Sequence, residues 1–147
     1  HNRHRVAEDT EHELEAAYWD DLDQMLAHMD IVSVNCPLTD QTRGMLSAAR
    51  LARLQRHAVI VNTSRGEIID ENALCDLLER RQIAAAGLDV FVNEPHLNPR
   101  LLKLDNVVLT PHLGYVTEDN YRGMYSQALE DISAFRSGSP VRGLSST

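Results

Sequence analysis

Short apolar runs, rich in β-branched residues, alternate with longer amphipathic stretches along the chain. Each run ends at a polar or turn-forming residue, which is typical of a strand in a parallel sheet. Four strands are predicted in this way, over residues 31–34, 58–62, 83–90 and 106–110. Residues 58–61 are entirely apolar, so we expect that strand to be buried on both faces.

The stretches between and after these runs carry apolar residues at helical spacing. Helices are predicted over residues 70–80, with Asp70 as the N-cap, and over residues 118–135. Because strands alternate with helices, the sequence predicts an α/β fold, a parallel sheet with helices on both faces. The weaker predictions are an exposed acidic helix over 7–17, a very short strand within 16–19, a helix over 21–28 capped by Asp20, a helix capped by Ser47, and an irregular segment over 91–100.

The composition excludes several classes of function. A net charge of −8 argues against a nucleic-acid surface, since phosphate binding requires a basic footprint. No apolar run reaches the length of about 18 residues that a transmembrane helix needs, and the polar start of the chain is unlike a signal peptide. Two cysteines, Cys36 and Cys75, suit a reducing cytosol. The seven histidines show no metal-ligand spacing, so we predict no metal site.

Polar side chains follow each predicted strand at its carboxyl end. Because these ends meet at one edge of a parallel sheet, residues far apart in the sequence are expected to line one crevice. An arginine, a carboxylate and a histidine on one edge can bind a carboxylate and move a proton beside it. Each residue taken singly has a structural alternative, such as a helix cap or a surface ion pair. The residues concerned are Asn35, Cys36 and Pro37; Thr63, Ser64, Arg65 and Gly66; Asp89 and Glu94; and Thr110, Pro111 and His112.

Four motifs in this order resemble those of the D-isomer-specific 2-hydroxyacid dehydrogenases. The motifs are DIVSVNCPLTDQT, VNTSRGEIIDENAL, AAGLDVFVNEP and LTPHLGYVT, and they extend over residues 30–117. The resemblance implies a Rossmann-like parallel sheet that binds NAD or NADP. It also implies an oxidoreductase that transfers a hydride between this cofactor and a 2-keto or 2-hydroxy acid of D configuration.

The resemblance implies a role for each matching residue. Arg65 would clamp the substrate carboxylate, for which a planar guanidinium is suited. His112 would be the acid/base, and Glu94 would orient it and favour its protonated form. Asp89 would hold the nicotinamide carboxamide. Further contacts with the cofactor are implied for Cys36, Pro37, Thr42, Thr63, Ser64 and Gly114, and for Arg65 and His112 themselves.

One departure from the family bears on the choice of cofactor. The family usually has an acidic residue at the end of its second strand, where it binds the ribose 2′-hydroxyl. The matching place here is near Asn2, which is followed by Arg3 and Arg5. A neutral residue with nearby arginines suits a 2′-phosphate, so NADP is favoured over NAD. The alternative is that both arginines are merely exposed.

A second departure concerns what the chain does not contain. None of its seven glycines forms a GxGxxG phosphate loop, and the family's first strand and substrate domain have no counterpart. We therefore expect an incomplete sheet with an unpaired edge beside residues 31–34, in an enzyme fragment that is inactive alone. Residues 1–117 would form a partial dinucleotide-binding domain. Residues 118–147 would form a helix and tail that return to the substrate domain.

Two alternatives to a 2-keto acid reductase remain. Some relatives keep the scaffold as a non-catalytic, nucleotide-sensing module, although Arg65, Glu94 and His112 together argue against that here. A formate or phosphite dehydrogenase would keep the arginine and histidine, but formate enzymes typically pair the histidine with glutamine. The resemblance further implies a homodimer. The cysteine usage, the acidic net charge and the lack of a long apolar run predict a cytoplasmic protein with no nucleic-acid or membrane partner.

Overall fold

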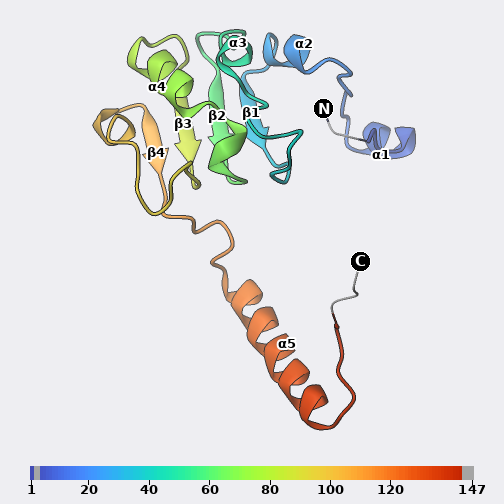
Figure 1. Cartoon of the computed structure of the whole chain (residues 1–147). Coiled ribbons are helices and arrows are strands. Elements are labelled where there is room, and N and C mark those ends of the chain that lie inside the picture. The colour runs from blue at the N-terminus through green and yellow to red at the C-terminus, as the bar shows by residue number, and fades with distance from the viewer. Residues whose placement is uncertain (2–3, 144–147) are drawn as a thin grey trace. The chain divides into compact units, whose positions relative to one another are not determined.

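The computed structural model describes residues 1 and 4–143, which separate into two compact units (Figure 1). The first unit runs from His1 to His112 and the second begins at Leu113. The first unit contains a parallel sheet whose strands pair in sequence order, which confirms the predicted fold class. The strands are β1 (Ile31–Val34), β2 (Val59–Asn62), β3 (Ala85–Leu88) and β4 (Val107–Leu109).

The helices of the first unit lie close to where they were predicted. They are α1 (Glu8–Glu13), α2 (Leu22–Leu26), α3 (Ala48–Leu51) and α4 (Glu71–Glu79), with 3-10 turns η1 (Gly66–Ile68) and η2 (Leu101–Lys103). Asp70 caps α4 as expected, since its side chain accepts the Ala73 N–H at 3.1 Å.

Two local predictions were wrong, and a third was confirmed only in position. Asp21, not Asp20, caps α2, because its carboxylate accepts the N–H groups of Asp23 and Gln24. Ser47 is the N-cap residue of α3, as predicted, although its side chain makes no capping hydrogen bond. Residues 16–19 contain no strand.

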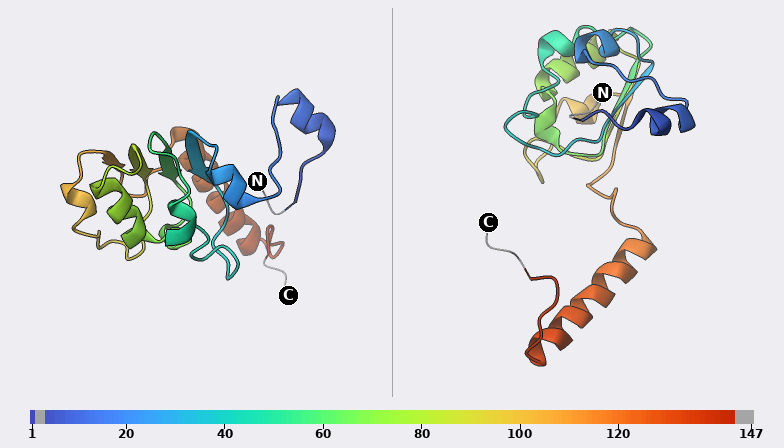
Figure 2. Two further views of the ribbon diagram at one scale, coloured as in Figure 1. Left: turned by 90° about the horizontal axis from the view of Figure 1, so that it is seen from above. Right: turned by 90° about the vertical axis from the view of Figure 1, so that its right-hand side faces the viewer.

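The helices that pack on the sheet cover one of its faces. Alternate strand residues are buried, and they share a core with leucines from α2, α3 and α4. The right-hand view of Figure 2 shows α3 and α4 on the same side of the sheet. On the other face Ile31 is 66% exposed and Val59 and Val61 are half-buried. Within the first unit the helices therefore lie on one face of the sheet, and the prediction that β2 is buried on both faces was wrong.

The strand order explains why the helical layer is one-sided. A right-handed crossover between parallel strands places its connecting helix on a fixed side, and that side changes only when the strand order reverses. Here each strand from β1 to β4 is added in the same direction, so the intervening helices share one face. β1 ends the sheet among the described residues, which confirms the predicted unpaired edge.

The second unit consists chiefly of α5 (Glu118–Arg136), which confirms the predicted helix. Its amino end is capped by the Thr117 hydroxyl, which accepts the Asn120 N–H at 3.2 Å. The helix has no buried residue, and Leu129 and Phe135 are 66% and 76% exposed. None of the helices within residues 1 and 4–143 is long and apolar enough to cross a lipid bilayer.

Candidate active site

The four strands end in register at one edge of the sheet. Val34 pairs with Asn62, Asn62 with Leu88, and Leu88 with Leu109. The segments that follow these residues therefore all start at the same edge, as the sequence predicted (Figure 1). They are residues 35–37, 63–66, 89–94 and 110–112.

Arg65 lies in a loop after β2 that is held on both sides. Before it, the Asn62 side chain donates to the Arg65 carbonyl at 2.9 Å and accepts the Ser64 N–H at 3.0 Å. After it, Gly66 packs so closely against Phe91 that a Cβ would lie 2.1 Å from the Phe91 carbonyl carbon. The guanidinium is exposed, and its Nη1 donates to the Ser64 carbonyl at 2.7 Å.

The loop also contacts the end of β1, where a cavity of about 710 Å³ opens. The Ser64 hydroxyl donates to the Cys36 carbonyl, and the Thr42 hydroxyl donates to the Pro37 carbonyl at 2.7 Å. Cys36, Pro37 and Thr42 line the cavity, whose volume is within the usual range of small-molecule sites. Three of the predicted cofactor residues are thus brought together, whereas Thr63 is exposed beside them.

Asp89, directly after β3, is a buried carboxylate that is 5% exposed. The Thr110 hydroxyl donates to its Oδ1 at 2.5 Å, and the Asp89 N–H donates to the Asn62 carbonyl at 3.0 Å. Because two neighbouring strands fix it, this carboxylate is a preorganised acceptor for an amide or hydroxyl donor.

His112 and Glu94 form an ion-pair contact at the end of β4. The His112 Nδ1 lies 2.7 Å from Glu94 Oε2, and the Phe91 N–H donates to Glu94 Oε1 at 2.9 Å. His112 has a φ of +57°, which is uncommon for a residue with a side chain and is often found at functional sites. An apolar cavity of about 400 Å³ adjoins the pair and is lined in part by Leu97 and Leu109.

The electrostatics of this pair favour an ionised Glu94. Partial burial alone would raise the pKa of the carboxyl group. The hydrogen bonds from His112 and the Phe91 N–H, with the charges of His112 and Arg65, outweigh burial and hold the pKa of Glu94 below its ordinary value. The site therefore presents a carboxylate against the imidazole, and the guanidinium of Arg65 is close enough to contribute.

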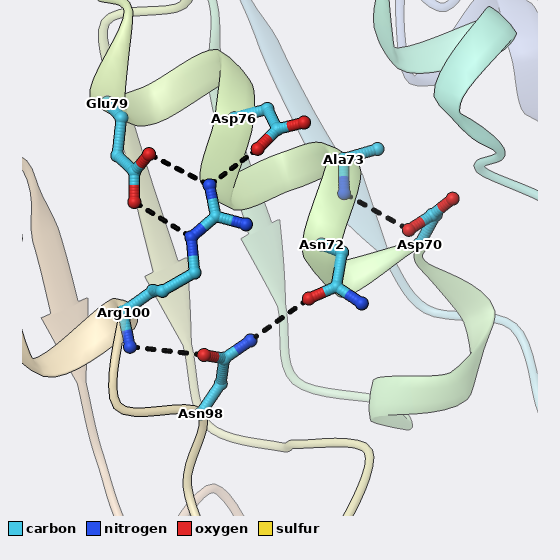
Figure 3. Close-up of polar contacts among 7 residues, drawn as sticks. All are labelled: Asp70, Asn72, Ala73, Asp76, Glu79, Asn98 and Arg100. Atoms are coloured by element: carbon cyan, nitrogen blue, oxygen red, sulfur yellow. Dashed lines mark hydrogen bonds and ion pairs between the residues drawn. The ribbon is translucent and has the colours of Figure 1, made fainter.

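An arginine that the sequence reasoning missed anchors the segment that carries Glu94 (Figure 3). Arg100 donates to both Glu79 oxygens at 2.8 Å and also bonds Asp76, so it ties the end of residues 91–100 to α4. Asn98 extends the contact by donating to the Asn72 side chain at 3.4 Å. The Asp76 and Glu79 spacing on one helix face was a readable signal, but their partner could not be found without the fold.

The predicted residues near the amino terminus are not all placed. Asn2 and Arg3 lie outside the described residues. Arg5 donates to both Glu11 oxygens at 2.9 and 2.7 Å and lies 5.3 Å from the centre of the Tyr18 ring. Glu11 is thereby buried while the other residues of α1 are exposed, so the predicted exposed acidic helix is confirmed except at this residue. Gly114 belongs to the second unit, and its cofactor role stays a prediction.

Comparison with known proteins identifies the family to which this fold and site belong. The profile of the family described as "D-isomer specific 2-hydroxyacid dehydrogenase, NAD binding domain" matches residues 1–114. The chain belongs to this family, as its motifs predicted.

Individual relatives agree with the family match. The glyoxylate reductase of Thermococcus litoralis is 40% identical over 130 residues, which cover 88% of this chain and 39% of that enzyme. The crystal structure of a D-isomer specific 2-hydroxyacid dehydrogenase from Polaromonas sp. is 36% identical with a TM-score of 0.88, and covers 99% of this chain and 45% of that one.

A third relative was solved with ligands. The glyoxylate/hydroxypyruvate reductase of Sinorhizobium meliloti, in complex with NADP and malonate, is 33% identical with a TM-score of 0.76, and covers 86% of this chain and 41% of that one. The chain spans less than half the length of each of these three relatives.

The residues present fit two separate parts of a nicotinamide dinucleotide. The buried Asp89 carboxylate and the cavity lined by Cys36, Pro37 and Thr42 provide an amide acceptor and a space of suitable size. The sequence has no glycine-rich loop to cradle the phosphates. Asp89 would hold the carboxamide of the nicotinamide, and the cavity at the end of β1, which Asp89 does not line, would hold another part of the cofactor.

Proposed function

We propose that this chain is part of an oxidoreductase that transfers a hydride between NAD(P)H and a 2-keto acid to give a D-2-hydroxy acid. The observation that carries the proposal is the 2.7 Å contact between His112 and Glu94 on the same sheet edge as Arg65. A proton donor, its carboxylate partner and an exposed guanidinium are the groups that reduction of a keto acid needs.

The proposed chemistry assigns each group a separate task. Arg65 holds the substrate carboxylate by charge and by its planar set of donors. His112 gives a proton to the carbonyl oxygen, which becomes the hydroxyl group, and Glu94 stabilises the charged imidazole before this transfer. Asp89 accepts a hydrogen bond from the carboxamide of the cofactor. The nicotinamide, when bound, supplies the hydride.

Both NADP and NAD are candidates for the cofactor. The preference for NADP depended on arginines near the ribose, and Arg5 is engaged by Glu11 through two hydrogen bonds. That engagement weakens the preference, although the reductase from Sinorhizobium meliloti binds NADP. The direct measurement is the ratio of dissociation constants for NADPH and NADH.

A small 2-keto acid such as glyoxylate or hydroxypyruvate is the proposed substrate class. The names of the Thermococcus and Sinorhizobium relatives support this choice. A formate-type enzyme is disfavoured because the partner of His112 is a carboxylate with a lowered pKa, not a neutral amide. A non-catalytic binding module is disfavoured because such a module has no need of the His112–Glu94 pair beside Arg65.

The proposed context of the chain follows from its family. We propose a cytoplasmic homodimer, with residues 1–117 in the dinucleotide-binding domain and residues 118–147 returning to a substrate domain. The exposed apolar side chains of α5, such as Leu129 and Phe135, support a role in packing against another domain. Sedimentation analysis of the natural full-length protein tests the dimer, and a single monomer species would contradict it.

A spectrophotometric screen of the natural full-length protein tests the proposed activity. Oxidation of NADPH and NADH is followed with glyoxylate, hydroxypyruvate, pyruvate and phenylglyoxylate, and the reverse reaction with formate and phosphite. We expect turnover with at least one 2-keto acid. Turnover with formate or phosphite alone would move the chain to that class. No turnover, with nucleotide binding intact, would favour the binding module.

A further inference from the structure

Asn62 is a polar residue in an apolar environment. It is the last residue of β2, it is 1% exposed, and its side chain lies on the face of the sheet that packs against the helices. Burial of an amide is unfavourable unless both of its ends are hydrogen-bonded. Both ends of this amide are bonded, and both partners belong to the loop that carries Arg65.

The two contacts allow the amide only one orientation. The Ser64 N–H can only donate and the Arg65 carbonyl can only accept, so the Asn62 Oδ1 faces Ser64 at 3.0 Å and Nδ2 faces Arg65 at 2.9 Å. The main-chain carbonyl of Asn62 also accepts the Asp89 N–H at 3.0 Å. One residue therefore fixes the loop of Arg65 and the strand end of Asp89 at once.

We propose that Asn62 is a positioning residue for substrate binding, because its amide sets the direction in which Arg65 projects from the sheet edge. The proposal rests on the proposed role of Arg65 as the clamp for the substrate carboxylate. Arg65 lies between β2 and η1 with φ −147° and ψ 140°, and the long 3.3 Å bond from the Ile68 N–H to its carbonyl leaves room for further restraint. The two hydrogen bonds of the Asn62 side chain restrain the backbone of Ser64 and Arg65. The contact of Gly66 with Phe91 restrains the backbone directly after Arg65.

The sharpest variant is Asn62→Asp, which keeps the size of the side chain. The variant retains an oxygen for the Ser64 N–H but replaces the donor to the Arg65 carbonyl by a second acceptor. Asn106→Asp is the matched control at the opposite end of the sheet. Asn106 is also an asparagine whose Nδ2 donates to main-chain carbonyls, at 3.3 Å to Leu78 and 3.2 Å to Ala84.

Steady-state kinetics of the natural full-length protein test the proposal. Asn62→Asp should raise KM for the keto acid about tenfold or more, because the Arg65 carbonyl loses the Asn62 donor and faces a second acceptor, so that the loop and its cation move. The same variant should change the dissociation constant of the nucleotide less than about twofold. Asn106→Asp should change neither this dissociation constant nor KM by more than about twofold. In an Arg65→Ala background, Asn62→Asp should add less than about twofold to KM. An equal effect in both backgrounds would overturn the proposal, because it would show a general structural role.

A readout that does not depend on turnover separates this proposal from the proposed function. The rate at which phenylglyoxal modifies Arg65 is measured by mass spectrometry in the wild type and in the two asparagine variants. We expect the rate to change severalfold in Asn62→Asp and to stay unchanged in Asn106→Asp. An unchanged rate in Asn62→Asp overturns the positioning role even if the enzyme proves inactive, whereas loss of turnover alone bears only on the function.

Discussion

The Nδ1 atom of His112 lies 2.7 Å from Glu94 Oε2, so the carboxylate faces this ring nitrogen. An ionised carboxylate can only accept, and therefore Nδ1 carries its hydrogen toward Glu94. We propose Nε2, the other ring nitrogen, as the atom that exchanges a proton with a substrate. The contact thus fixes both the orientation of the ring and the atom that would perform acid/base chemistry.

Removal of this imidazole should abolish most of the activity. We expect His112→Ala to lower kcat by about 10²- to 10⁴-fold, the usual contribution of a positioned general acid. Nucleotide affinity should change little, since Asp89 and the cavity at the end of β1 are untouched. Turnover with glyoxylate and fluorescence titration with NADPH measure the two effects. A wild-type kcat in this variant would remove His112 from the chemistry.

Arg65 should contribute chiefly to substrate affinity. Arg65→Ala should raise KM for the keto acid about tenfold or more, because a charge-assisted pair with the carboxylate is lost. Arg65→Lys should recover only part of the affinity, since an ammonium cannot reproduce the two-pronged guanidinium contact. An unchanged KM in the alanine variant would contradict the carboxylate role.

The lowered pKa of Glu94 predicts how stability depends on pH. Its pKa is 4.5 in a solvated reference and lower in the folded chain, so the folded state favours the ionised form. The resulting stabilisation is fully present above pH 4.5 and is lost as the pH falls through the folded pKa. The Glu94→Gln variant has no carboxyl group at this position and therefore lacks this pH-dependent stabilisation.

Urea denaturation of the wild type and Glu94→Gln between pH 7 and pH 3 tests this prediction. The difference between their midpoints should shrink as the pH falls below about 4.5. A difference that is constant over the whole range would mean that the carboxylate has the same pKa in both states.

The close approach of Gly66 to Phe91 predicts a strong effect of a single methyl group. A Cβ at position 66 would lie 2.1 Å from the Phe91 carbonyl carbon, and main-chain atoms there cannot move aside cheaply. We expect Gly66→Ala to destabilise the first unit by about 3 kcal/mol, the upper end of the range for overpacking.

Gly123→Ala is the matched control for this substitution. Gly123 lies inside α5 with nothing within 4 Å of its would-be Cβ, so alanine there should stabilise the helix by about 0.5–1 kcal/mol. Chemical denaturation and amide exchange measure both variants. Equal stabilities for Gly66→Ala and the wild type would show that the contact with Phe91 is not tight.

The anchor at Arg100 should hold the segment that carries Glu94. Arg100→Gln removes the ion pairs with Asp76 and Glu79, so residues 91–100 should exchange their amide hydrogens faster. Arg122→Gln, which breaks an exposed pair with Glu118 in α5, is the control and should leave that segment unchanged. Unaltered protection of residues 91–100 in Arg100→Gln would contradict the anchoring role.

Most elements and the location of the site were predictable because they depend on local pattern. The β-branched run before Asn62 and the polar residues after it predicted β2 and the loop that follows it without knowledge of its neighbours. The parallel arrangement then required Arg65, Asp89 and His112 to meet at one edge. Their chemical roles came from the resemblance of the motifs and are proposals that the experiments above test.

Long-range packing was not predictable in the same way. The local pattern does not indicate that Arg5 bonds Glu11 and not a ribose phosphate. It also does not indicate which of the fourteen lysines and arginines bonds Asp76 and Glu79, a position that the structure gives to Arg100. The one-sided helical layer was also missed, because residue pattern does not report the order in which strands are added. These features depend on which surfaces meet in three dimensions.

The sequence by itself determined the four strands, the main helices and the family to which the chain belongs, because periodicity and motif order are local properties. Only the tertiary structure decided that Glu94 bonds to His112 through Nδ1, and that Asn62 brackets the loop of Arg65. The physical reason is that hydrogen bonds are directional and short. Their partners are chosen by backbone positions that become fixed only when distant segments pack together.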